Sequence, residues 1–307
     1  MSIPTLPGIT AKTVTTSRLT TRVLFSGADD GIPVLFLHGN ASSATYWEET
    51  MLALPAGYRA IAPDQRGYGD ADRSAKIDAT RGLSDLADDA AALLDHLSIQ
   101  RAHIVGHSLG GSVVFTMLMD HSPRFLTATL AATGSPYGFC GTKDAEGTPN
   151  YPDFAGSGGG IVNRAFADRM ASGDRGVENP QSAPRIVMNS FYWKPGFVAK
   201  REEELLTSMM SEHIGDQEYP GDLTPSANWP NVAPGVLGPA NALSPKYTGD
   251  VSRLFRIEQK PPVLWVRGEH DQIISDRSMF DLGTLGSMGF VPGWPGMDVF
   301  PPQPMVT

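Results

Sequence analysis

The sequence lacks the features that mark several large classes of protein. It has one cysteine, Cys140, so no disulfide can form within the chain. It has no run of lysine or arginine and a formal net charge of −9 at pH 7, which argues against nucleic acid and anionic membranes as partners. No apolar run is long enough to span a membrane, and the start, MSIPTLPGIT, lacks the basic and apolar regions of a signal peptide. We therefore expect a cytoplasmic protein.

Short apolar segments alternate with helical patterns along much of the chain. The segments 33–39, 58–64, 101–105, 127–133 and 262–268 are typical of buried parallel strands, and 11–17 with 19–27 are typical of an antiparallel edge pair. Helical spacing of apolar residues occurs over 84–97, where Ser84 is the expected cap, and over 110–119. This alternation predicts an α/β fold with a doubly wound, mostly parallel sheet.

The rhythm breaks between residues 135 and 260. This region is rich in proline, glycine and aromatic residues, and only NRAFADRMA (163–171) and KREEELLTSMMSEHI (200–214) have helical patterns. Insertions of this length in an α/β sheet commonly cover the active site. We predict a core formed by residues 1–134 and 261–307, and a cap formed by residues 135–260.

One short motif points to a chemistry. Residues 106–110 read Gly-His-Ser-Leu-Gly, between a predicted strand and a predicted helix. A serine on such a turn is lifted above the sheet edge and faces the start of the helix, where the N–H of Leu109 is free to hold an oxyanion. The strand–turn–helix context favours a nucleophilic Ser108 over a serine without function.

Three further motifs complete a resemblance to the α/β-hydrolase fold. His38-Gly39-Asn40 is similar to the family's oxyanion loop. DQRGYGDADR (64–73) resembles the segment D-x-R-G-x-G-x-S, with Asp70 and Ala71 where a serine often stands. GEHDQII (268–274) resembles the turn that supplies the acid of the catalytic triad. Together the four motifs span most of the predicted core.

The resemblance implies roles for individual residues. Ser108 would be the nucleophile, Asp271 would orient and stabilise the triad histidine, and the N–H groups of Asn40 and Leu109 would form the oxyanion hole. Asp271 also has a plainer interpretation as the cap of the segment that follows it, with Asp276 as the alternative acid. The resemblance implies no cofactor and no metal. We also expect Asp64 and Arg66 to pair and brace their loop.

The residue type at the nucleophile position restricts the classes of reaction that are consistent with the sequence. Similar proteins that open epoxides or release halide need aspartate there, whereas this chain has Ser108, which favours acyl transfer. We predict a serine hydrolase that acts on a small, largely apolar carboxylic ester or lactone. A carbon–carbon bond hydrolase uses the same residues, and a cofactor-free perhydrolase or haloperoxidase usually has little cap. A non-catalytic binding protein is the remaining alternative.

The general base is the residue that the sequence does not supply. In this family the histidine follows the acid, yet no histidine follows His270. His96 and His121 fit helix ends, His103 lies at the wrong end of its strand, and His213 lies in the cap. We therefore expect the natural protein to continue for about 40–70 residues, with a helix, a strand and a Gly-His loop, by analogy with the fold's usual ending.

Candidate pocket residues are His38, His107, Trp193 and Trp229. His38 also has an interpretation as a packed structural histidine beside the oxyanion loop. His107 occupies the variable position of the serine motif, which favours a place in the pocket wall. Aromatic and methionine side chains of the cap are equally consistent with cap core and with pocket wall; they are Phe191, Tyr192, Trp193, Met209, Met210 and Trp229.

Overall fold

A computed structural model describes residues 3–306, and its centre is a mostly parallel sheet. In this part of the chain seven strands pair in the order β1-β2-β4-β3-β5-β6-β11. They are β1 (Thr10–Thr15), β2 (Thr20–Gly27), β3 (Ile32–Leu37), β4 (Tyr58–Pro63), β5 (Ala102–His107), β6 (Phe125–Ala131) and β11 (Val263–Val266).

The pairing confirms the predicted doubly wound α/β fold. β1 and β2 are antiparallel to each other, β2 is antiparallel to β4, and the remaining neighbours are parallel. The buried strands are near-continuous apolar runs because both faces of the sheet are covered there. The carboxyl ends of β3 and β5 are adjacent, with Leu37 opposite Gly106, so the loops that follow these two strands meet.

Two apolar cores lie on the two faces of the sheet. The larger one packs α2 (Ser84–His96) and α3 (Leu109–His121) on the sheet through residues such as Leu94, Ile104 and Val113, all essentially buried. The smaller one packs η1 (Ala44–Trp47) and α1 (Glu48–Leu52) on the opposite face through Phe36 and Met51. The helix predicted from Ser84 onwards is confirmed, although Leu83 is its N-cap and no side chain caps it.

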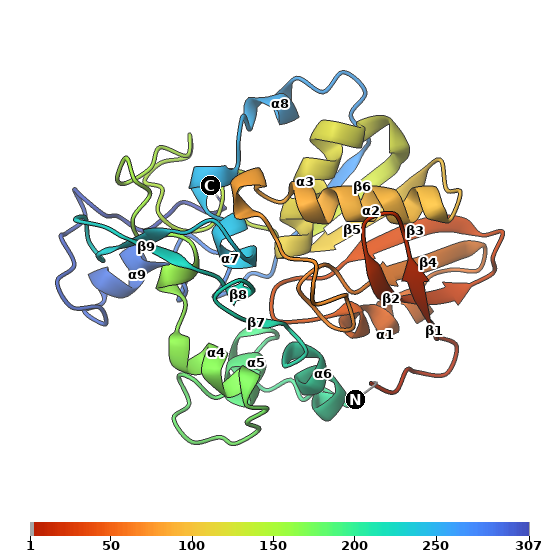
Figure 1. The fold of residues 1–307 in the computed structure, drawn as a ribbon, viewed down its shortest axis with the longest axis horizontal. Coiled ribbons are helices and arrows are strands. Elements are labelled where there is room, and N and C mark those ends of the chain that lie inside the picture. Colours follow the sequence, from red (N-terminus) through yellow and green to blue (C-terminus); the bar gives the residue numbers. More distant parts are fainter. Residues whose placement is uncertain (1–2, 307) are drawn as a thin grey trace.

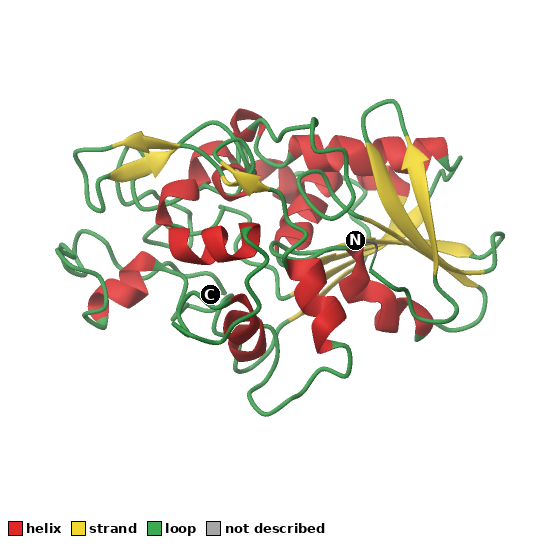
Figure 2. Cartoon of the chain, turned by 60° about the horizontal axis from the view of Figure 1, so that its bottom comes forward, coloured by secondary structure: helices red, strands yellow, loops and turns green. Residues whose placement is uncertain are grey.

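The insertion consists of short elements joined by long loops, and Figures 1 and 2 show it beside the sheet, with the C-terminal segment on the same side. Its helices α4 (Arg164–Ala171) and α6 (Glu202–Met209) fall within the two predicted helical patterns, whereas α5 (Pro184–Phe191) was not predicted. Its other short elements are β7 (Ile214–Gly215), β8 (Tyr219–Pro220), β9 (Leu223–Pro225), β10 (Val232–Pro234), α7 (Pro239–Ala242), α8 (Ser252–Phe255), η4 (Gly159–Ile161) and η5 (Pro245–Tyr247). Two further short helices, η2 (Ala79–Arg81) and η3 (Ser122–Arg124), belong to the core.

The segment after β11 packs against the insertion. It contains one helix, α9 (Leu282–Ser287), and within residues 3–306 no strand follows β11. Phe300 is fully buried between the rings of Tyr151 and Trp229. Gln303 bonds the backbone N–H of Cys140 through its side-chain oxygen at 2.6 Å. Two segments that are distant in sequence therefore share one packed layer.

The outer edge of β11 pairs with no strand in the described part of the chain. Its four residues, Val263, Leu264, Trp265 and Val266, are 39–59% exposed, although all are apolar. An unpaired apolar strand of this kind is a template for pairing with another chain. Among the described residues, no helix combines the length and the apolar character needed to cross a bilayer.

The predicted ion pair between Asp64 and Arg66 is wrong. Asp64 instead binds Arg22 of β2 through both carboxylate oxygens, at 2.9 and 3.1 Å. Arg66 binds Asp89 of α2 at 2.7 and 2.8 Å. Asp64 and Arg66 are two residues apart at the end of a strand, and their side chains turn toward different elements, so each finds a partner there.

Candidate active site

Ser108 lies at a sharp turn between β5 and α3. Its backbone has φ 52° and ψ −120°, which is the left-handed side of the map that non-glycine residues rarely adopt. Such a conformation costs roughly 1–3 kcal/mol and persists only where the surrounding structure enforces it. The turn is closed by the hydrogen bond from the Ser108 N–H to the Ala131 carbonyl at 3.0 Å. The geometry is that of a nucleophile raised above the sheet edge.

Glycines let the oxyanion loop approach this turn. A β-carbon on Gly39 would lie 3.0 Å from the Ser108 β-carbon and 2.9 Å from Nδ1 of His107. A β-carbon on Gly110 would collide with the carbonyl oxygen of Leu37. The loop that begins at His38 and the start of α3 are therefore in direct contact beside Ser108.

The two predicted oxyanion donors are available on this surface. Leu109 is the first residue of α3, so its N–H has no acceptor within the helix. No backbone hydrogen bond in residues 3–306 uses the N–H of Asn40. Since Gly39 touches Ser108, both groups border the position where a tetrahedral oxyanion would form.

His38 supports the oxyanion loop from below. Its Nε2 accepts the Gln65 N–H at 3.0 Å, which leaves Nδ1 to donate to the Gly39 carbonyl at 2.8 Å. Burial lowers the pKa of His38 to about 4, although the nearby Asp64 carboxylate opposes this shift. His38 is thus a neutral structural histidine with both ring nitrogens engaged by the protein, which leaves neither for a substrate.

The side chain of Asn40 is held by a buried tyrosine. The hydroxyl of Tyr68 donates to Oδ1 of Asn40 at 2.7 Å, and Tyr68 is fully buried. With Oδ1 used, the side-chain amide of Asn40 keeps its N–H groups for other partners, and Tyr219 lies against this amide. Burial raises the pKa of Tyr68, so its hydroxyl stays protonated and remains a donor.

His107 and Asp271 come within electrostatic range of each other. Burial lowers the pKa of His107, while the carboxylate of Asp271 acts in the opposite direction. The His107 ring packs edge-on against Trp47, with centroids 6.4 Å apart. Asp271 accepts the N–H groups of Ile273 and Ile274 at 2.8 and 2.9 Å, as in its plainer interpretation as a cap.

Among residues 3–306, no histidine makes a hydrogen bond to the Ser108 hydroxyl. No side chain in this part of the chain hydrogen-bonds the Ser108 hydroxyl, and the histidines at 96 and 121 end α2 and α3 as expected. His213 binds the Gly69 carbonyl at 3.2 Å, and His103 approaches Thr127 at 2.7 Å. The alternative acid, Asp276, accepts the N–H of Val306 at 2.8 Å.

The two predicted pocket tryptophans lie in different surroundings. Trp193 packs beside Tyr192 and Phe197 in the apolar cluster of α4, α5 and α6, with its indole N–H buried and without an acceptor. Trp229 packs edge-on against Phe300 and donates to the Pro292 carbonyl at 3.1 Å. The structure therefore brings Trp193 close to the oxyanion loop, because the same cluster contains Ala41, and places Trp229 on the C-terminal segment.

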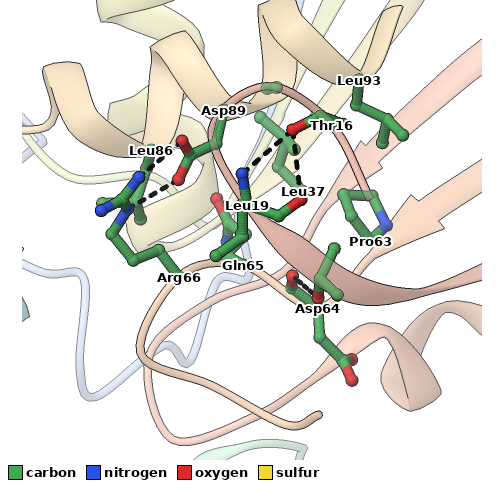
Figure 3. Close-up of a pocket in the computed structure, with 12 residues that line it drawn as sticks. Thr16, Leu19, Leu37, Pro63, Asp64, Gln65, Arg66, Leu86, Asp89 and Leu93 are labelled. Carbon is green, nitrogen blue, oxygen red and sulfur yellow. Dashed lines mark hydrogen bonds and ion pairs between the residues drawn. The ribbon is translucent and has the colours of Figure 1, made fainter. Parts of the chain in front are cut away.

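A small cavity on the α2 side of the sheet is not a substrate site. Figure 3 shows it between Leu37, Gln65 and the Arg66–Asp89 ion pair. Its volume is about 20 Å³, room for about one water molecule, and Ser108 does not line it. In the described residues, no group of three or more histidine, cysteine, aspartate or glutamate side chains is arranged to bind a metal.

Several residues around the oxyanion loop were not predicted from the sequence. They are Tyr68, Tyr192, Tyr219 and Glu212, which gather at Asn40 and Ala41. Tyr68 occupies a variable position within the motif 64–73, and the other three lie in the insertion, where no periodic pattern indicates which side chains turn inward. Only the adjacency of Tyr68 to that motif was a usable signal.

Comparisons with known proteins agree with this geometry. Residues 32–157 match the family described as alpha/beta hydrolase fold. Epoxide hydrolase A of Mycobacterium tuberculosis is 38% identical over 129 residues, which cover 41% of this chain and 39% of that protein. The 2-hydroxymuconate semialdehyde hydrolase of Pseudomonas sp. (strain CF600) is 34% identical over 102 residues, which cover 32% of this chain and 35% of that protein. These matches span less than half the length of either relative.

Solved structures extend the fold likeness over nearly the whole chain. The crystal structure of E-2-(acetamidomethylene)succinate hydrolase superposes with a TM-score of 0.52 at 21% sequence identity, covering 94% of this chain and 89% of that one. At this identity the likeness concerns the fold alone. The serine turn, the adjoining loop and the strand order agree with the α/β-hydrolase fold, and residues 32–157 match the model of the family of that name.

Proposed function

We propose that this chain is a serine hydrolase that cleaves a small, largely apolar carboxylic ester or lactone. The observation that carries the proposal is the strained Ser108 turn, which lies in contact with a loop that has an unused N–H at Asn40. Strain of this kind is a feature of functional sites, since it has no structural benefit of its own. A serine at this position supports attack on a carbonyl carbon.

The proposed reaction has two halves. The Ser108 oxygen attacks the ester carbonyl and its proton passes to a base, while the N–H groups of Asn40 and Leu109 stabilise the oxyanion. The alcohol leaves with that proton, which gives an acyl-enzyme on Ser108. Water then attacks the acyl group in the same manner, and the carboxylic acid is released.

The base in this proposal is a histidine that Asp271 orients, although in residues 3–306 the hydrogen bonds of Asp271 are to the N–H groups of Ile273 and Ile274. Asp271 would then add to its present hydrogen bonds one to the imidazole. In such a triad the acid contributes roughly 4–6 kcal/mol and the nucleophile considerably more.

The substrate class follows from the charges around the loop. Arg22, which reaches the hydroxyls of Ser43 and Thr45 after this loop, is buried and engaged with Asp64, so it is not available to an anionic substrate. The insertion places Trp193, Phe191 and Met210 around a core that contacts Ala41. This environment supports an uncharged, apolar acyl or alcohol group. We propose a cytoplasmic location, consistent with a lone buried cysteine.

A substrate panel tests the proposal. The protein as its gene encodes it is assayed with short alkyl esters, γ- and δ-lactones, their carboxylate-bearing analogues and a vinylogous 1,5-diketone. We expect kcat/KM to be highest for an uncharged ester or lactone and to vanish in Ser108→Ala. Preference for the diketone would instead indicate carbon–carbon bond hydrolysis, and no turnover of any compound would indicate a binding protein.

A further inference from the structure

The backbone of the oxyanion loop is strained next to Asn40. Ala41 has φ +46°, in the left-handed region that a residue with a side chain rarely adopts. We call Asn40 and Ala41 the oxyanion turn. A left-handed alanine is maintained only where neighbouring groups hold it, so the contacts of this turn determine whether the Asn40 N–H stays aimed at the substrate.

One of these contacts comes from the insertion. Tyr192, the residue after α5, donates its hydroxyl to the Ala41 carbonyl at 2.9 Å, and the same oxygen lies 3.4 Å from the Asn40 carbonyl. Burial raises the pKa of Tyr192, so the hydroxyl keeps its proton and remains a donor. The hydrogen bond fixes the carbonyl side of the oxyanion turn.

A second contact comes from Glu212, which lies shortly after α6. Glu212 is only 4% exposed, and its carboxyl lies against the N–H of Ala41 and the hydroxyl of Tyr68, although neither makes a hydrogen bond of good geometry with it. The titratable groups that face Glu212 are the phenols of Tyr68, Tyr192 and Tyr219, and no cation is among them. Burial raises the pKa of Glu212, which favours the uncharged form of the carboxyl.

We propose that Tyr192 and Glu212 are positioning residues that hold the oxyanion turn, so that the insertion assembles the oxyanion hole. The inference rests on the proposed function of Ser108. The insertion would then act on the rate of the chemical step as well as on substrate choice. Displacement of α5 and α6 would release Ala41 and move the Asn40 N–H away from the oxyanion.

The structure provides a matched control at the same interface. Tyr46 of η1 donates its hydroxyl to the Leu205 carbonyl of α6 at 3.1 Å, and its ring lies 5.9 Å from that of Tyr192. Tyr46 and Tyr192 therefore each donate to a backbone carbonyl across the contact between the core and the insertion. Tyr46 belongs to the core and binds the insertion, whereas Tyr192 belongs to the insertion and binds the core. Of these two tyrosines, only Tyr192 donates a hydrogen bond to the oxyanion turn.

The experiment compares Tyr192→Phe with Tyr46→Phe in the protein as its gene encodes it. Loss of a whole oxyanion-hole donor costs about 10²–10³-fold in kcat, and a misaligned donor costs less, so Tyr192→Phe should lower kcat by about tenfold with KM within about twofold. Tyr46→Phe should leave kcat unchanged while lowering the melting temperature by a similar amount. Equal kcat values in the two variants would overturn the proposal.

The role of Glu212 is tested with two substitutions: Gln has a side chain of similar shape to Glu, and Ala does not. Glu212→Gln keeps an uncharged group of the same size and should retain at least half of the wild-type kcat, whereas Glu212→Ala should lose about as much as Tyr192→Phe. If Gln is as impaired as Ala, an uncharged carboxyl is not what holds the turn. A fluorophosphonate titration separates this result from failure of the proposed function, because positioning variants should label to full extent, only more slowly. A wild-type protein that takes up no probe would refute the role of Ser108.

Discussion

Acidification should destabilise this protein through His38 more steeply than its carboxylates alone would. The buried ring accepts the Gln65 N–H and donates to the Gly39 carbonyl, so it has no place for a second proton. Its pKa is about 4 in the folded protein and 6.5 in an unfolded chain. Between these two pH values the unfolded chain binds a proton that the folded chain does not, so stability falls as the pH is lowered. The gap corresponds to about 3 kcal/mol.

The matched variant is His38→Gln, whose side-chain oxygen reaches the Gln65 N–H but does not titrate. Urea unfolding of both proteins gives the free energy of unfolding across the range from about pH 7 to about pH 4. The variant is expected to be less stable at neutral pH, and the difference should shrink by about 3 kcal/mol at the acid end. A difference that stays constant over this range would show that His38 is not a buried neutral histidine.

Three further predictions concern other parts of the structure. Relative to the wild type, Glu212→Gln should stabilise the fold increasingly above about pH 4.5, by up to about 1.4 kcal/mol per pH unit until the raised pKa of Glu212 is reached. The reason is that only the wild-type carboxyl must keep a proton in the folded protein that the unfolded chain releases. A difference in unfolding free energy between the two proteins that does not change with pH would contradict this. Asp64→Asn should cost about 3–5 kcal/mol in urea unfolding, since it removes the buried, hydrogen-bonded counter-charge of Arg22 and leaves only the exposed carboxylate of Asp70 at 3.8 Å. A cost below about 1 kcal/mol would count against the Arg22–Asp64 ion pair. Leu264→Lys on the exposed edge of β11 should reduce self-association in sedimentation velocity, and unchanged association would show that this edge is not the contact.

The serine turn and the oxyanion loop could be predicted because their geometry is local. The apolar runs before His38 and before Ser108 identify two buried parallel strands, and such strands end at the same edge of a sheet. The glycines two residues before and two residues after Ser108 then indicate the sharp turn. The positions of the strands and of the helices around 84–97 and 110–119 were likewise predicted from periodicity and composition, whereas the order of the strands was not.

Contacts between distant segments could not be predicted from the sequence. Asp64 finds Arg22 across two strands, 42 residues earlier in the chain, so its nearer neighbour Arg66 was chosen wrongly. Tyr192 and Glu212 reach the oxyanion turn only because α5 and α6 pack on the loop 40–47, and the insertion has little periodicity to reveal α5. The burial of Phe300 against Trp229 joins segments 71 residues apart, for which no local pattern exists.

The central claim is that Ser108 is the nucleophile, and covalent labelling tests it most directly. The protein as its gene encodes it is incubated with a fluorophosphonate, digested, and analysed by mass spectrometry. We predict a single adduct on the peptide that carries Ser108, and none in Ser108→Ala, because only this hydroxyl lies beside the unused N–H groups of Asn40 and Leu109. An adduct that persists in Ser108→Ala, or that forms on another residue of the wild-type protein, would contradict the account.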